Sequence, residues 1–162
     1  IRRNRVARTK EESREAQEAA QGYSDRVNRD YIKAPALAHQ EENVLGMLLL
    51  YPEYVRIVIQ EGLLSEDDFF TAFNKKVFCY IRDCYEQGYT SMNDIDKDFT
   101  EEEVGRIARM KVSRMELSDN SEAVLRECVA SMRACAARRA SENISSLADL
   151  DSLLNKIREE KT

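Results

Sequence analysis

The sequence predicts an all-α protein, a helical bundle followed by a C-terminal helical hairpin, and three observations carry this prediction. Glycine (5) and proline (2) are scarce among the 162 residues, whereas Ala, Leu, Glu and Arg are plentiful. This composition favours helices over many short strands. Apolar residues recur at steps of three and four, and capping residues precede several of these segments. The predicted parts are a basic, charged linker at 1–35, the bundle at 36–136 and the hairpin at 137–162.

The predicted linker differs from the rest of the chain in charge. Residues 1–10 hold five basic and no acidic side chains, whereas the remaining 152 residues hold 20 basic and 30 acidic ones. The acidic body repels a phosphate backbone, so we expect no direct binding of nucleic acid by it. Residues 9–21 would form a solvated helix, and Tyr23–Pro35 an extended connector. Because the chain begins with Ile1, we expect it to be part of a longer protein.

The first two bundle helices are expected at Leu37–Tyr51 and immediately after Pro52. From Val44 to Leu50 the first helix has no polar face to offer to solvent, which is typical of a central, buried helix. Pro52 then stands at the first position of a shorter helix that ends at Gly62.

Two further helices follow, each behind a capping signal. Ser65 with Asp68 predicts the start of a helical region that ends at Gly88. Thr100 and Glu103 form a capping box before the next helix, whose thinner apolar stripe is typical of the outside of a bundle. The stripes are Phe70, Phe73, Val77, Ile81 and Cys84 on the first helix, and Val104, Ile107, Ala108 and Met115 on the second.

The longest helix is predicted at Asn120–Asn143. Its apolar stripe stops after Ala137, so we expect the helix to leave the bundle and run into solvent. After Ser145-Ser146, a second amphipathic helix is predicted. Either it folds back as a hairpin and buries its leucines, or a partner covers part of its stripe. The candidate contact residues are Ile144, Leu147, Leu150, Leu153, Leu154 and Ile157, flanked by Arg138 and Arg139.

The sequence offers no catalytic or metal-binding constellation. It has no glycine-rich phosphate loop, and His39 is its only histidine. The acidic run Asp94–Asp98 starts like a calcium loop, but Phe99 and Gly105 occupy the positions that need glycine and glutamate. The four cysteines match no zinc spacing and fit free thiols in a reducing cytoplasm. The longest apolar run, Val44–Tyr51, is too short to span a membrane.

Four segments carry a resemblance to a known family. AHQEENVLGMLLLYPEYVRIV (38–58) resembles an acidic pair, an apolar helix and a proline-started second helix. LLSEDDFFTAFNKKVF (63–78) contains an Asn-basic-basic-Val-Phe motif, and FTEEEVGRIARM (99–110) resembles a Leu-Thr-x-Glu-Glu-x-Gly-x-Ile run. DRVNRDYIKAPALAHQEE (25–42) is similar to a connector between domains. In this order, over residues 25–135, they resemble the helicase-binding C-terminal domain of bacterial DnaG-family primases.

The resemblance implies a non-catalytic module of a cytoplasmic primase at the bacterial replication fork. Such a module docks on the N-terminal tier of the hexameric DnaB-type helicase, and the zinc and magnesium sites of the parent enzyme belong to upstream domains. Tethering would keep primer synthesis near the exposed single strand. In many relatives the hairpin is longer and has a glycine near its turn, whereas the expected turn here is the compact ISSLADLD (144–151).

Two alternatives stand beside this interpretation. The first is the N-terminal domain of the replicative helicase itself, which shares the fold and binds primase. Its Val-Leu-Gly-x-Leu-Leu-Leu segment resembles Val44–Leu50 of this chain. The second is a small helical enzyme whose site would lie at Asp94–Asp98, which tight metal binding would support.

Overall fold

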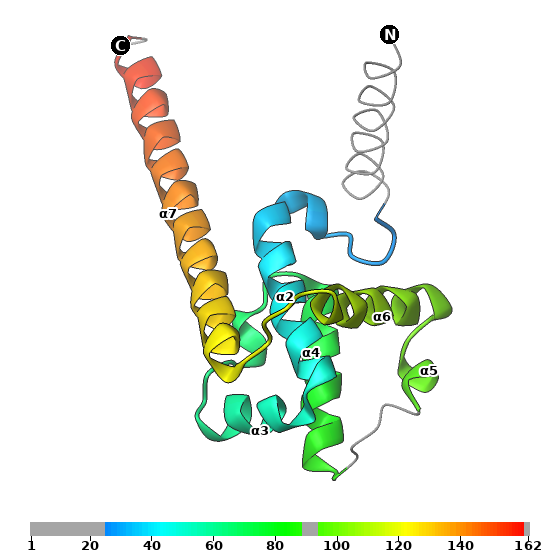
Figure 1. Ribbon diagram of the computed structural model, residues 1–162. Helices are drawn as coiled ribbons and strands as arrows, with labels where there is room; N and C mark the ends of the chain where they lie inside the picture. Colours follow the sequence, from blue (N-terminus) through cyan, green and yellow to red (C-terminus); the bar gives the residue numbers. More distant parts are fainter. Residues whose placement is uncertain (1–24, 89–93, 161–162) are drawn as a thin grey trace, which may run out of the picture.

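The computed structural model describes residues 25–88 and 94–160, and each regular element in these residues is helical (Figure 1). The elements are η1 (Tyr31–Lys33), α2 (Pro35–Leu50), α3 (Pro52–Gln60), η2 (Glu66–Asp68), α4 (Ala72–Glu86), α5 (Ile95–Asp98), α6 (Glu101–Met115) and α7 (Glu122–Glu160). Helices α2, α3, α4 and α6 and the start of α7 form a bundle, from which the rest of α7 projects as a rod (Figure 1). The predicted all-α class is confirmed.

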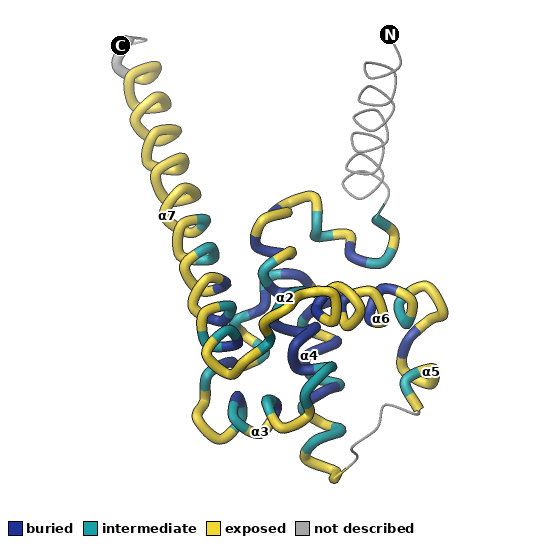
Figure 2. The backbone as a smooth tube through the Cα atoms, in the orientation of Figure 1, coloured by how far each residue is buried: buried dark blue, intermediate teal, exposed yellow. Residues whose placement is uncertain are grey.

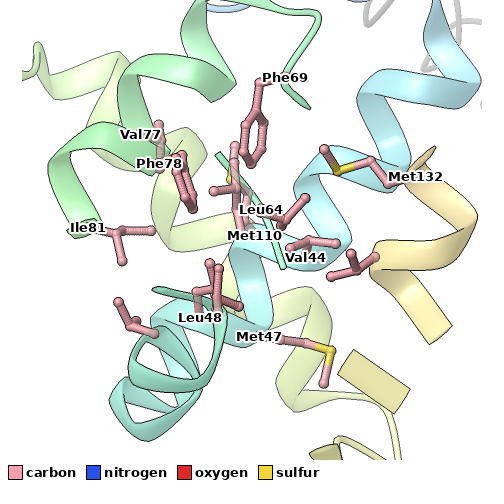
Figure 3. Close-up of a cluster of buried hydrophobic side chains, with 14 of the residues drawn as sticks. Val44, Met47, Leu48, Leu64, Phe69, Val77, Phe78, Ile81, Met110 and Met132 are labelled. Carbon is pink, nitrogen blue, oxygen red and sulfur yellow. The ribbon is translucent and has the colours of Figure 1, made fainter. Parts of the chain in front are cut away.

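Helix α2 is the centre of the bundle, as predicted. It begins with Pro35 at its first position and packs against α3, α4, α6 and α7. Val44, Leu45 and Met47 have no exposed surface. Burying such side chains on all sides stabilises the fold by roughly 1.5–3 kcal/mol each. Figure 3 shows the labelled α2 side chains among those of the surrounding elements: Leu64, Phe69, Val77, Phe78, Ile81, Met110 and Met132.

The close packing of α2 against α6 depends on Gly46. A Cβ atom at this position would lie 2.5 Å from the carbonyl oxygen of Met110 and 2.6 Å from Cγ of Arg114. Both distances are shorter than a van der Waals contact, and a backbone carbonyl inside a helix cannot move aside. Glycine therefore allows α2 and α6 to approach closely.

Replacing Gly46 by alanine is expected to destabilise the domain by about 1–3 kcal/mol, because overpacking forces α2 and α6 apart. Gly105 of α6 is the matched control, since a Cβ atom there meets nothing within 4 Å. Gly105→Ala should stabilise the domain by about 0.5–1 kcal/mol through helix propensity. Urea unfolding followed by circular dichroism measures both effects. A Gly46→Ala variant as stable as the wild type would contradict the close approach.

The buried face of α6 differs from the predicted one. Ile107 is buried as expected, but Ala108 and Met115 are exposed, whereas Arg106 and Arg114 are buried. An apolar stripe could not reveal this face, because charged side chains are buried only where tertiary partners satisfy them. Arg114 lies against α2 and donates from Nε to Oδ1 of Asn120, 3.0 Å away. Nine of the 15 residues of α6 are exposed, so it covers the outside of the bundle as predicted, but its inner face differs from the predicted one.

Capping residues set the helix starts, with one correction. The capping box of Thr100 and Glu103 at the start of α6 is confirmed. The box of Ser65 and Asp68 is also present, but it opens only the short turn η2. Phe69 then takes an extended conformation, and α4 begins after Thr71, whose hydroxyl oxygen accepts from the Asn74 N–H at 3.3 Å. The local signal marked the right residues but not the length of the element that follows.

A buried carboxylate joins α2 to the start of α4. Glu41 is fully buried and accepts hydrogen bonds from the backbone N–H of Phe70, the Thr71 hydroxyl (2.7 Å) and the Asn74 side-chain amide (2.9 Å). Among the described residues no cation pairs with it. Burial therefore raises the pKa of Glu41 above its usual value, although the hydrogen bonds act in the opposite direction.

The described part of the predicted linker belongs to the packed structure. Asp25 forms an ion pair with Arg106 at 3.2 Å. The buried Asn28 donates to the Thr71 hydroxyl at 3.2 Å, and Asp30 accepts from the Ala72 N–H at 3.0 Å. An extended connector at Tyr23–Pro35 is therefore wrong for its described part, because these contacts join residues more than 40 positions apart. The helix predicted at residues 9–21 lies outside the described residues.

The C-terminal hairpin is also wrong, because α7 is one continuous helix from Glu122 to Glu160. No turn occurs at Ser145-Ser146 or elsewhere in the expected segment 144–151. The 39 residues of α7 contain neither glycine nor proline, so nothing interrupts the backbone hydrogen bonds. Serine lowers helix propensity only slightly, and two serines do not end a helix.

Candidate functional site

The part of α7 beyond the bundle, residues 137–160, is called the arm here. Figure 2 shows that it is exposed along nearly its whole length. The six apolar residues that the sequence singled out all lie on it, with exposed fractions from 67% at Ile144 to 43% at Ile157. Soluble domains rarely leave such a contiguous set uncovered without a use for it. The other four are Leu147, Leu150, Leu153 and Leu154.

The exposed stripe of the arm continues the face of α7 that packs into the bundle. Leu125, Val129 and Met132 are buried in the bundle at steps of four and three. The same spacing, close to that of a two-helix seam, continues beyond the bundle without a break. The residues that follow on this face are Ala136, Ala140, Asn143, Leu147, Leu150, Leu154 and Ile157.

The two flanking arginines have different positions at the base of the arm. The Arg139 guanidinium lies over the Phe70 ring, 4.1 Å from its centroid, and is partly buried. This cation–π contact holds the base of the arm against the bundle. Arg138 is exposed. The sequence therefore placed both residues beside the stripe, but only the structure distinguishes a contact within the domain from a side chain available to a partner.

Two cavities flank the base of the arm. One, of about 340 Å³, lies between α7 and the start of α2 around Pro35 and Arg138. The other, of about 350 Å³, lies between α7 and the segment around Phe69 and Phe70, and Arg139 borders both. No sequence pattern indicates these cavities, because each combines residues from elements far apart in the chain.

Charged residues of both signs lie along the arm. Arg138 and Arg139 precede Glu142 at its base, Asp149 and Asp151 lie in its middle, and Lys156 and Arg158 precede Glu159 and Glu160 at its end. Polar residues that flank an apolar stripe are the arrangement found where one helix binds another. The arm can thus supply apolar contact area with a charged rim.

Two further cavities lie away from the arm. A cavity of about 220 Å³ contains His39, but its Arg106 is paired with Glu42 at 2.6 Å and with Asp25. A cavity of about 330 Å³ between α2, α3 and α4 is lined mainly by apolar side chains such as Leu48 and Ile81. The described residues contain no group of three or more His, Cys, Asp or Glu placed to hold a metal ion.

The cysteines are partly buried and are not joined in disulfides. Burial raises the pKa of the Cys128 thiol, and burial together with a hydrogen bond to Glu66 raises that of Cys79. Both therefore favour the neutral thiol, which is a poor nucleophile and metal ligand. Within residues 25–88 and 94–160 no helix is long and apolar enough to cross a membrane.

Several residues of the recognised motifs have structural roles. Asn74 of the FNKKVF motif binds Glu41 of the acidic pair, and Glu42 binds Arg106. Gly46 permits the contact between α2 and α6. These motif residues therefore specify the fold, and by themselves they do not reveal which partner the domain binds.

Comparison with known proteins agrees with this fold. Residues 33–127 match the family of DnaB-like helicase N-terminal domains, the family named above as the first alternative. No curated protein and no solved structure matches the chain. The match covers more than half of the chain, including α2 to α6 and the beginning of α7, and it ends before the arm. The chain therefore belongs to the family of DnaB-like helicase N-terminal domains.

Proposed function

We propose that this domain is a non-catalytic docking module through which the replicative helicase and the primase of a bacterial replication fork associate. The observation that carries the proposal is the exposed apolar stripe of the arm, which lies outside the bundle and has no cover among the described residues. The acidic body would leave the binding of nucleic acid to other domains.

The family match favours the helicase side of this pair. In that case the domain is the N-terminal domain of the helicase, and it presents the arm to primase. The match over residues 33–127 supports this assignment directly, because the family is defined by helicase domains.

A second assignment, the helicase-binding domain of primase, has support from residues outside the match. Residues 25–32 resemble the primase connector, and they are integral to the fold through the contacts of Asp25 with Arg106 and of Asn28 with Thr71. In that case the domain docks on the N-terminal tier of the helicase hexamer, and any zinc or magnesium would belong to upstream domains of the primase.

Size-exclusion chromatography distinguishes the two assignments. The domain is mixed separately with the DnaB-type hexamer and with the primase of the same organism. Co-elution with the hexamer would identify the primase side, and co-elution with primase the helicase side. Elution of the domain at its own volume in both mixtures would overturn the proposal.

Calorimetric titration with calcium tests the remaining alternative, that the chain is a small helical enzyme. That alternative requires tight metal binding at Asp94–Asp98.

A further inference from the structure

The cavity of about 330 Å³ between α2, α3 and α4 is called the α3 cavity here. Figure 1 shows α3 and the second half of α4 at the end of the bundle from which the arm points away. None of the residues that line the cavity belongs to α7. Cavities that bind small molecules measure roughly 300–1,000 Å³ and are lined mainly by apolar side chains. In both respects the α3 cavity fits a small molecule.

The inner wall of the α3 cavity belongs to the hydrophobic core. Leu48, Val55 and Ile81 line the cavity and are buried, with at most 6% of their surface exposed. Figure 3 shows Leu48 and Ile81 within the core cluster. Their positions are fixed by packing against the rest of the core, so the cavity exists before any ligand enters. A ligand therefore binds without the free-energy cost of ordering the site.

The outer part of the α3 cavity favours an aromatic ligand. Tyr85 is half-buried there, and Arg56 is exposed at the rim. Within the described residues Arg56 has no ion pair or ring contact, so its guanidinium is available. An aromatic ring stacks on a guanidinium and packs against a tyrosine ring. Cys84 also lines the cavity and offers a polarisable sulfur.

The charges at the rim of the α3 cavity cancel. Glu53 and Arg56, both exposed on α3, are the charged residues of the lining. One acidic and one basic side chain together select neither an anion nor a cation. An ionic group on the apolar inner wall would also lose its hydration without gaining a partner. The cavity therefore fits an uncharged molecule.

We propose that the α3 cavity is a binding site for an uncharged aromatic small molecule, whose ring lies against Tyr85 and Arg56. A ligand that binds only the folded state stabilises it, so binding would stabilise the junction of α2, α3 and α4. Binding at this site is independent of the docking proposed for the arm, because the two surfaces share no residue.

N-phenylnaphthylamine, an uncharged aromatic dye whose fluorescence rises in apolar surroundings, is the probe for this site. The wild-type chain should bind it with saturation at a single molecule per chain. Cys84→Phe fills the cavity and should weaken binding by about tenfold or more. Glu86→Phe adds the same ring at an exposed position of α4 outside the cavity and should bind within about twofold of the wild type. Urea midpoints establish that both variants are folded.

Anilinonaphthalene sulfonate, a related dye that carries a negative charge, tests the choice of an uncharged ligand. It should bind the wild type about tenfold or more weakly than the neutral dye, because the sulfonate loses hydration at the cavity. Equal affinities of the two dyes would overturn the assignment to an uncharged ligand. No binding of the neutral dye by the wild type, or equal binding by Cys84→Phe, would overturn the site itself.

Thiol protection in the wild type locates the bound dye without any variant. A saturating concentration of the neutral dye should slow the alkylation of Cys84 by iodoacetamide, followed by mass spectrometry of the peptides. Cys135, which is also partly exposed but lies on α7, is the internal control and should react at an unchanged rate. Protection of Cys135 with no protection of Cys84 would place the dye at the base of the arm and overturn the proposal.

Discussion

A domain in which Leu150 and Leu154 are both replaced by aspartate is expected to lose about 100-fold or more in affinity for its replication partner. The two side chains have exposed fractions of 54% and 49% and lie on the same face of the arm. Burial of a leucine contributes roughly 1.5–3 kcal/mol, and a buried carboxylate adds a desolvation penalty. A loss of about 1.4 kcal/mol corresponds to a tenfold change in the dissociation constant. Isothermal titration calorimetry with the partner measures the effect.

The matched control is the double variant Ser145→Asp with Ser152→Asp. These serines are exposed and lie on the opposite face of the arm, so the control adds the same charge to the same helix. It should bind within about threefold of the wild type, because rim charges mainly alter association rates. Both variants should retain the unfolding midpoint of the bundle. Equal loss in both variants would show that the charge of the arm, and not its apolar stripe, governs binding.

Replacing Glu41 by alanine is expected to destabilise the bundle by about 3–5 kcal/mol. The change leaves the N–H of Phe70 and the polar side chains of Thr71 and Asn74 without their acceptor in a buried site. Unsatisfied buried donors cost about 1–3 kcal/mol each, and the removed side chain also leaves a cavity. This is a large share of the roughly 5–15 kcal/mol that stabilises a domain. Urea denaturation measures the loss, with Glu127→Ala, on the exposed face of α7, as the control.

The same carboxylate should leave a signature in the pH dependence of stability. Burial raises the folded-state pKa of Glu41 above its ordinary value of 4.5. Between the ordinary and the raised pKa, the folded state binds more protons than the unfolded state, so this contribution to stability is lost as the pH rises. Glu61 and Glu66 have lowered pKa values, so the pH dependence of their effect is the opposite. Their contribution to stability is present above pH 4.5 and is lost as the pH falls below it.

A comparison of the wild type with Glu41→Gln isolates this contribution. From pH 4.5 upward, the wild type should lose stability relative to the glutamine variant, because glutamine remains uncharged over the whole range. The urea midpoints of the two proteins should therefore approach or cross as the pH rises. Parallel plots of the two urea midpoints against pH would show that Glu41 does not have a raised pKa. For the Glu41→Ala variant, a loss of unfolding free energy below about 1 kcal/mol would show that the buried hydrogen-bond network contributes little.

The sequence alone determined the features that depend on near neighbours in the chain. The all-α class, the central helix around Val44–Leu50, the proline start at Pro52 and the capping box at Thr100 depend on residues within about four positions of each other. The six apolar residues of the arm could be identified for the same reason. Their stripe has helical spacing whether or not any other part of the protein contacts it.

The tertiary structure decided the features that depend on distant partners. The expected hairpin became a straight arm, since nothing in the described bundle contacts the far half of α7 and no glycine or proline bends it. The binding of Glu41 to Asn74, and of Asp25 to Arg106, joins segments whose proximity no local pattern reveals. The cavity of about 350 Å³ beside Arg139 forms only where α7 passes Phe70. Burial depends on what lies beside a residue in space, and helical periodicity shows only which residues share a face.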